Sequence, residues 1–385
     1  MERRKDSKGK VLKDGESQRK DGIYQYRWTD KTGKRHTIYA KDLKVLREKE
    51  NNANKIISQG IDFEGGKITT YQFLIRYYEF KKTSIKKSSL KTYYTTTNKL
   101  KDTSIGNTKI IDVKISDAKQ LIIDLSQNGL KYSTIKTIKT LIKAAFKMAQ
   151  EDDLILKNPF DFQLNEVIKN DTKKRVALTE QQYSDLLEFV LCDRVFRKYY
   201  DDIVFLYETG IRVSEFCGLT LSDIDFVKHE VVIDKQLIKT SKGELYITDP
   251  KSKAGFRTIP LSAEAYHAIK AIINRRPQTN EMMVDGYCGF ISIHSNGTPK
   301  TAWNIEYELR EIAKAYNSLY PECQLPNLTP HVLRHTFCTR KVSSGMNIKA
   351  VQYLMGHSSV QITLDVYTSI DADMIKTEFA KVAQM

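Results

Sequence analysis

An amphipathic repeat in the middle of the chain places the strongest constraint on its fold. In the stretch STIKTIKTLIKAAFKMAQ (133–150), apolar residues recur at Ile135, Ile138 and Ile142. This spacing puts them on one face of an α-helix, and that face must be buried against other elements. Three neighbouring stretches, TTYQFLIRYYEFKK, SSLKTYYTTTNKL and ISDAKQLIIDLSQNG, have similar spacing. We therefore predict an all-α bundle of four helices over residues 66–168.

The region that follows is also helical in pattern, with one interruption. The runs EVVIDKQLIKT, LYITDP and FRTIP, within residues 230–260, are strand-like and are separated by turn residues. Such alternation is typical of short antiparallel strands. We expect a mainly α domain over 176–385 with an inserted antiparallel three-stranded β-element. The polar stretch KNDTKKR (169–175) is typical of a linker to the bundle.

Residues 1–65 predict a small α+β domain. IYQYRWT (23–29), the turn signal DKTGK and RHTIYA (35–40) are typical of a β-hairpin with aromatic residues at alternating positions. A helix is expected over 41–58. Residues 1–50 hold sixteen Lys or Arg and nine Asp or Glu. Positive charge and aromatic strands favour a DNA-binding appendage, and a merely solvated basic end is the alternative.

Charge and cysteine usage narrow the class of protein. The chain of 385 residues has a formal net charge of +15, which favours a polyanionic partner, nucleic acid ahead of a membrane. No apolar run approaches the roughly eighteen residues that a membrane-spanning helix needs, and no signal peptide is indicated. The five cysteines are odd in number and lack CxxC spacing. A reducing cytoplasm is therefore expected.

Five lysines gather where the first helix of the bundle leads into the second. They could contact DNA phosphates, and a solvated charged face is nearly as good an explanation. The five are Lys81, Lys82, Lys86, Lys87 and Lys91.

The stretch HVLRHTFCTRKVSSGMNIKAVQYLMGHSSVQITLDVYT (331–368) carries an unusual set of polar side chains. His331 and His335 are four residues apart and could face one metal ion from a helix. The zinc-protease pattern, however, needs Glu after the first histidine, where this chain has Val332, and Arg334 would repel a cation. We expect no metal here.

A phosphate suits the same residues better. HVLR places His331 and Arg334 on one helix face. A second arginine, Arg212, stands far upstream in TGIRVSE, where a loop enters a helix. Two guanidinium groups can bind phosphate oxygens and offset the charge that builds up in a five-coordinate phosphorane.

Taken in order, TGIRVSE, HVLRHTF, LMGHSS and a tyrosine ten residues beyond the last histidine resemble the motifs of the tyrosine recombinase family. KSKAGFRTIPL, between the first two motifs, resembles the lysine-bearing β-strand segment of that family. The helical bundle resembles its core-binding domain. The N-terminal region, with QRKDGIYQYRW, resembles the arm-binding domains of integrases from conjugative transposons of Gram-positive bacteria.

The resemblance implies a role for each polar residue of these motifs. Tyr367 would be the nucleophile, and Arg212 and Arg334 would hold the scissile phosphate. His331 and His357 would hydrogen-bond phosphate oxygens, with His331 also able to take the tyrosine proton.

The resemblance also implies a general acid and a residue that supports one of the arginines. Lys253 would protonate the departing 5′-oxygen, with Lys251 as a close rival. Glu215 would brace Arg212 from behind.

The chemistry is consistent with these roles. A tyrosine with a pKa of about 10 is ionised to roughly one part in a thousand at pH 7, so its attack requires a base or a cationic environment. An alkoxide leaving group requires an acid. Cationic side chains can replace the metal used in other phosphoryl transfers, and no Walker-type loop is present, so no cofactor is expected.

The function implied is that of a site-specific integrase acting in the bacterial cytoplasm, on the nucleoid when bound to DNA. It would cut double-stranded DNA at core sites through a 3′-phosphotyrosyl intermediate and a Holliday junction, as a homo-tetramer, and would bind separate arm sites. Free protein would be a monomer or a weak oligomer, and an accessory excision protein fits the family pattern. The alternative is a non-catalytic DNA-binding or architectural protein on the same scaffold.

The last fifteen residues, 371–385, predict a terminal helix. Ile375, Phe379 and Val382 form one apolar stripe that must be buried. The helix could pack on its own domain, or, as the resemblance implies, on a neighbouring protomer.

Overall fold

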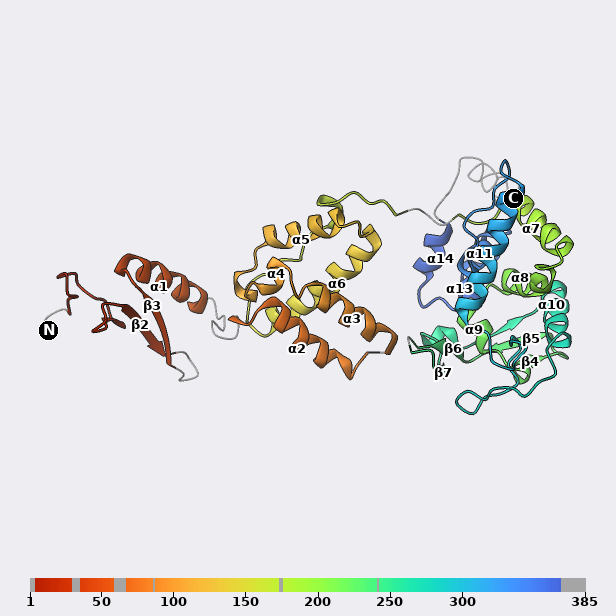
Figure 1. Cartoon of the computed structure of the whole chain (residues 1–385), viewed down its shortest axis with the longest axis horizontal. Helices are drawn as coiled ribbons and strands as arrows, with labels where there is room; N and C mark the ends of the chain where they lie inside the picture. The colour runs from red at the N-terminus through yellow and green to blue at the C-terminus, as the bar shows by residue number, and fades with distance from the viewer. Residues whose placement is uncertain are drawn as a thin grey trace, which may run out of the picture. The chain divides into compact units, whose positions relative to one another are not determined.

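The computed structural model describes residues 4–29, 35–58, 67–85, 87–172, 176–240 and 242–367. The chain divides into two compact units, 1–173 and 174–385, which are described separately (Figure 1). In the described residues no helix is both long and apolar enough to cross a membrane. The predicted tail helix over 371–385 lies outside the described residues.

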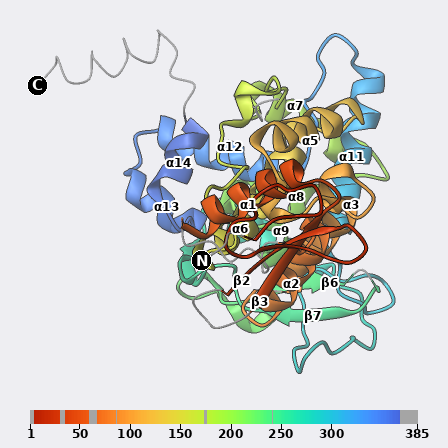
Figure 2. The ribbon, with the colours of Figure 1, turned by 90° about the vertical axis from the view of Figure 1, so that its left-hand side faces the viewer.

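The N-terminal part of the first unit is a small sheet covered by a helix (Figures 1 and 2). Strands β1 (Glu16–Gln18), β2 (Tyr24–Thr29) and β3 (Arg35–Ala40) pair antiparallel in chain order. Helix α1 (Leu43–Ser58) packs on β2 and β3. The small core between them consists of Leu12, Tyr24, Tyr26, Ala40, Leu43 and Leu46. The predicted α+β arrangement is confirmed.

The rest of the first unit is helical, as predicted. Its described residues form four long helices and one short one: α2 (Thr70–Lys82), α3 (Lys87–Lys99), α4 (Ser104–Asn107), α5 (Ile115–Gln127) and α6 (Tyr132–Glu151). The stripe of α6 is buried at Ile135, Ile138 and Ile142. Phe146 of the same helix packs against Phe160, with ring centroids 5.1 Å apart.

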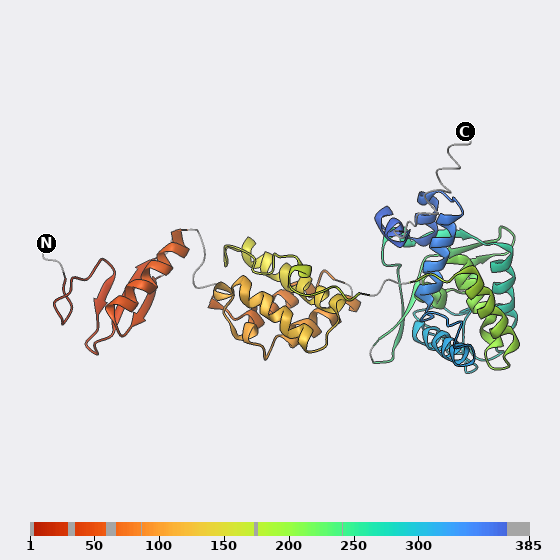
Figure 3. The ribbon, with the colours of Figure 1, turned by 90° about the horizontal axis from the view of Figure 1, so that it is seen from above.

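The second unit is mainly α, with short strands among its helices (Figures 1 and 3). Its helices are α7 (Glu180–Cys192), α8 (Tyr200–Thr209), α9 (Val213–Gly218), α10 (Ala263–Asn274), α11 (Ala302–Leu319), α12 (Pro330–Ser343), α13 (Ile348–Met355) and α14 (Val360–Tyr367). One continuous apolar core joins α7 to α12 and the strands.

The predicted three-stranded antiparallel sheet is present, but its strands are divided differently from the expectation. The sheet consists of β4 (Ile224–Asp225), β5 (Glu230–Ile233) and β8 (Arg257–Pro260). Strands β6 (Gln236–Lys239) and β7 (Leu245–Thr248) form a separate hairpin.

A buried ion pair lies where the first predicted run breaks. The Lys235 ammonium lies 2.6 Å from the Asp223 carboxylate, and both side chains are more than 90% buried. Lys235 therefore turns inward between β5 and β6, and the run EVVIDKQLIKT becomes two strands instead of one.

Candidate active site

Two glycines in left-handed conformation end the helices that lead into the polar cluster. Gly210, with φ 60°, ends α8, and Gly356, with φ 58°, ends α13. A β-carbon on Gly210 would lie 2.4 Å from the Phe337 ring, so both conformation and space require glycine there. Arg212 follows the first glycine by two residues, and His357 follows the second directly.

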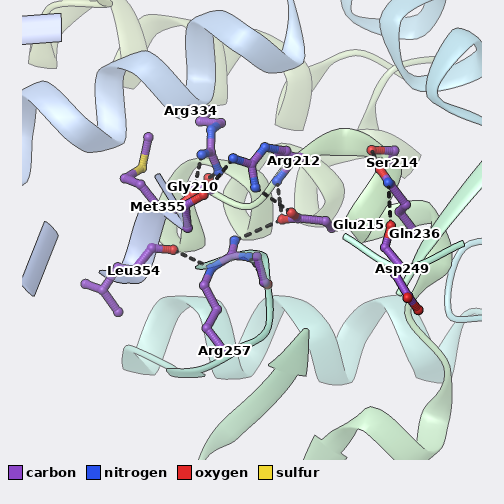
Figure 4. A network of polar contacts seen from close by, with 12 residues as sticks. Gly210, Arg212, Ser214, Glu215, Gln236, Asp249, Arg257, Arg334, Leu354 and Met355 are labelled. Carbon is purple, nitrogen blue, oxygen red and sulfur yellow. Dashed lines mark hydrogen bonds and ion pairs between the residues drawn. The ribbon is translucent and has the colours of Figure 1, made fainter. Parts of the chain in front are cut away.

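Three arginines from separate elements converge on the C-terminal end of α13 (Figure 4). Arg257 Nε donates to the Leu354 carbonyl at 2.7 Å, and Arg334 Nη2 donates to the Met355 carbonyl. Arg212 Nη2 donates to the Gly356 carbonyl at 2.8 Å. The last carbonyls of a helix lack intrahelical partners and form the negative end of its dipole. Three consecutive orphan acceptors are thus satisfied by three cations.

Glu215 lies between two of these arginines and is almost fully buried. Its carboxylate accepts from Arg212 Nη1 at 2.7 Å and from Arg257 Nη2 at 2.9 Å. It also accepts the backbone N–H of Arg212 at 3.0 Å. Burial alone would raise the pKa of Glu215, but Arg257 and Arg212 outweigh it and lower the pKa. The carboxylate is therefore ionised and fixes both guanidinium groups.

Two arginines, Arg212 and Arg334, form the clamp predicted to hold the phosphate, and Arg334 is the more enclosed of the two. Its Nη1 donates to the Gly210 carbonyl at 2.6 Å, and the side chain is buried. Burial, with a smaller contribution from Arg212, lowers the pKa of Arg334 to about 9. It still carries its charge at neutral pH. The cluster as a whole has an excess of positive charge, with three arginines against the single carboxylate of Glu215.

His357 follows the α13 end directly and is also buried. Its Nδ1 lies 3.0 Å from the Thr363 hydroxyl of α14. Burial and the nearby Arg334, Arg212 and Arg257 lower the pKa of His357 to about 4. The ring is neutral at physiological pH, so it can hydrogen-bond an anion without adding charge.

Three other predicted residues are exposed, on segments that adjoin this cluster in the chain or in space. His331 is exposed in the first turn of α12, one turn before Arg334. Lys253 is exposed in a 3₁₀ turn, η6 (Lys253–Gly255). A β-carbon on Gly356 would lie 2.9 Å from the Ala254 carbonyl, so this turn packs against the end of α13. Lys251, the rival of Lys253, is exposed as well.

The predicted nucleophile and the lysine cluster are only partly described. Tyr367 is the last residue of α14, which contacts α12 and α13, and its side chain lies outside what the structure describes. In the first unit, Lys81 and Lys82 end α2, and Lys91 is exposed on α3. Lys86 and the side chain of Lys87 lie outside the described residues. These lysines belong to the first unit, whereas the arginine cluster lies in the second.

Sequence reasoning missed Arg257. It sits in β8 at an inward-facing position, two residues before buried Ile259, and its side chain is fully buried. An inward-facing strand position is normally apolar, so a charged residue there requires partners. In FRTIP, Arg257 and Ile259 are two residues apart and therefore face the same side of the strand, and this pattern could have indicated a buried arginine.

No group of three or more His, Cys, Asp or Glu side chains in the described ranges is arranged to hold a metal ion. The charge of the site comes instead from the arginines.

The depressed pKa of His357 predicts a pH-dependent stability. An unfolded chain takes up a proton at this histidine near pH 6.5, whereas the folded chain resists until about pH 4. The contribution is fully present above pH 6.5 and is lost as pH falls toward 4, on the order of 3 kcal/mol in total. Urea denaturation at pH 7.5 and 4.5 should therefore show a smaller loss of stability in His357→Gln than in the unmodified chain. Equal losses in both proteins would contradict the assignment.

Family models match both ends of the chain. The model of the phage integrase family matches residues 176–374, and that of the DNA binding domain of Tn916 integrase matches residues 1–56. The transposase from transposon Tn916 of Enterococcus faecalis is 39% identical over 99% of this chain and 96% of its own length. Tyrosine recombinase XerC of Bacillus subtilis is 26% identical over 68% of this chain and 79% of its own length.

Solved structures agree with these matches. The Tn1549 transposon integrase, in complex with a circular intermediate DNA, superposes with a TM-score of 0.77. It is 37% identical and covers 82% of this chain and 99% of its own. Lambda integrase bound to a Holliday junction, at 16% identity and a TM-score of 0.52, shares the fold. The two domain matches and the near full-length identity leave one assignment: the chain belongs to the phage integrase family and is a tyrosine recombinase of the transposon-integrase type.

Proposed function

We propose that this chain carries out site-specific integration and excision of a transposon, with Tyr367 as the nucleophile. The observation that carries the proposal is the convergence of Arg212, Arg334 and neutral His357 at the end of α13. A guanidinium has five N–H donors, which leaves room for a phosphate beside the carbonyl and carboxylate contacts. The fixed positions of both arginines reduce the reorganisation needed when a phosphorane forms.

Each step of the proposed cleavage has a residue assigned to it. The Tyr367 oxygen forms a bond to phosphorus as its proton passes to His331, and the bond from phosphorus to the 5′-oxygen breaks. Lys253 gives a proton to that oxygen, so a neutral 5′-hydroxyl leaves. Arg212 and Arg334 balance the phosphorane charge, and His357 donates a hydrogen bond. Strand joining reverses these steps with a 5′-hydroxyl from another duplex, and the phosphotyrosyl bond conserves the energy, so no cofactor is needed.

The proposed assembly uses the remaining domains. Residues 66–168 would bind core sites together with 176–385, and the linker 169–175 would let the two close around duplex DNA. The domain 1–65 would bind arm sites, which raises the effective concentration of distant DNA segments. The Tn1549 integrase bound to circular intermediate DNA supports a DNA substrate. Two rounds of exchange in a homo-tetramer would pass through a Holliday junction in the bacterial cytoplasm, with the tail 371–385 and an accessory excision protein as regulators.

The basic residues at the α2–α3 junction would contact DNA backbone phosphates. They are Lys81, Lys82, Lys86, Lys87 and Lys91. Each alanine variant that removes such a contact should lower the salt slope of core-site binding by about 0.9.

The phenol of Tyr367 provides the most direct test. Tyr367→Phe should form no covalent adduct on a nicked core-site duplex and should keep its DNA affinity, because one oxygen contributes little to an extended electrostatic interface. Adduct formation is read by denaturing gel and affinity by gel shift. An adduct in Tyr367→Phe would refute the nucleophile, and none in the unmodified chain would favour a non-catalytic DNA-binding role.

Replacement of the 5′-bridging oxygen by sulfur tests the proposed acid. A thiolate leaves without a proton, so Lys253→Ala should cleave ordinary DNA about 100-fold or more slowly and the sulfur substrate at nearly the normal rate. Lys251→Ala is the matched control, two residues away in the same segment, and should cleave ordinary DNA at close to the normal rate. The reverse pattern would move the role to Lys251.

Removal of residues 1–66 tests the domain roles. The shortened chain should still cleave core sites and should lose its footprint on arm sites. Its salt slope on arm-bearing DNA should fall by about 0.9 for each phosphate contact removed. An arm-site footprint that survives the deletion would place arm binding elsewhere in the chain.

A further inference from the structure

Arg257 connects parts of the site that are far apart in the chain. Its side chain is fully buried, although arginine is almost never buried without partners. It follows the turn η6, which carries Lys253, by two residues. A displacement of this guanidinium is therefore expected to displace the turn as well.

The contacts of Arg257 involve three elements. Nη1 donates to the Gly255 carbonyl at 2.9 Å, at the exit of the turn. Nε donates to the Leu354 carbonyl at the end of α13 at 2.7 Å, and Nη2 donates to Glu215 of α9 at 2.9 Å. One rigid, planar group thus connects the turn η6 to α13 and to α9, the two elements whose residues accept hydrogen bonds from Arg212.

The clamp and the turn η6 depend on Arg257 to different degrees. Glu215 holds Arg212 through two hydrogen bonds of its own, and Arg212 reaches the Gly356 carbonyl without Arg257. The hydrogen bonds of Arg212 therefore do not pass through Arg257. The turn relies on Arg257 for the hydrogen bond at its Gly255 carbonyl, and it carries the exposed Lys253.

We propose that Arg257 is a positioning residue that places the Lys253 ammonium on the 5′-oxygen of the leaving strand. This inference rests on the proposed function and gives a role to a residue that had none in the argument for that function. Loss of the Gly255 contact would leave Lys253 misplaced, so the departing oxygen would go unprotonated while phosphate binding continued. A misplacement of about 1 Å can cost on the order of 100-fold in rate.

The test compares adduct formation on ordinary DNA and on DNA with sulfur at the 5′-bridging position. Arg257→Lys keeps the charge but cannot reach three partners from one rigid plane. It should cleave ordinary DNA about 10- to 100-fold more slowly and the sulfur substrate within about threefold of the unmodified chain. Cleavage of the sulfur substrate also shows that the variant is folded.

Three matched variants separate the explanations. Tyr353→Phe removes the hydroxyl that accepts the Thr258 N–H at 3.2 Å, a contact between the same strand and α13, and should leave both rates unchanged. Glu215→Gln weakens the hold on Arg212 as well as on Arg257, so it should also slow the sulfur substrate, which Arg257→Lys should not. Combining Arg257→Lys with Lys253→Ala should slow ordinary DNA no further than Lys253→Ala alone, since both changes remove one function.

Gly255→Ala tests the same connection without changing Arg257. A β-carbon there would lie 2.3 Å from the Pro250 side chain, so the turn must shift, whereas Arg257 and the arginines of the clamp are unchanged in sequence. Ordinary cleavage should slow and sulfur should restore it, an answer that does not depend on the folding of Arg257→Lys.

The outcomes are separable. Equal slowing of both substrates in Arg257→Lys, or an unchanged sulfur-to-oxygen ratio in Gly255→Ala, overturns the positioning role and leaves the proposed function standing. No adduct in the unmodified chain on either substrate overturns the proposed function itself.

Discussion

The hydrogen bonds from three arginines to the last carbonyls of α13 are the interaction on which the rest of the site depends. Alone, three guanidinium groups would repel one another, and three unpaired carbonyls would be costly to bury. Together they satisfy each other, and Glu215 offsets part of the remaining charge. The helix end fixes the spacing of the arginines, and the arginines fix the helix end. His357, the next residue after Gly356, is positioned by the same contacts.

Much of this could be predicted from sequence. The helical spacing predicted the bundle, and the motifs around Arg212 and Arg334 predicted which segments would meet. What the sequence did not reveal was the role of carbonyl groups, because a backbone acceptor leaves no trace in residue type. Arg257 was missed for that reason: two of its partners are the Leu354 and Gly255 carbonyls.

Strand boundaries were harder to predict than strand content. EVVIDKQLIKT contains enough β-branched residues for one long strand, and local propensity gives no reason to divide it. The division comes from Asp223, twelve residues before Lys235, whose ion pair turns the lysine inward. Such a tertiary contact cannot be detected from the residue pattern of a short sequence segment.

The same ion pair has a consequence for how the domain can vary. Because Lys235 closes β5 before the hairpin begins, β6 and β7 pair with each other and not with the β4–β5–β8 sheet. Residues added to or removed from the free end of that hairpin leave the register between β5 and β8 unchanged. Natural selection or protein engineering can therefore alter the length of the hairpin independently. Strand β8, which follows the turn η6 with Lys253, keeps its place.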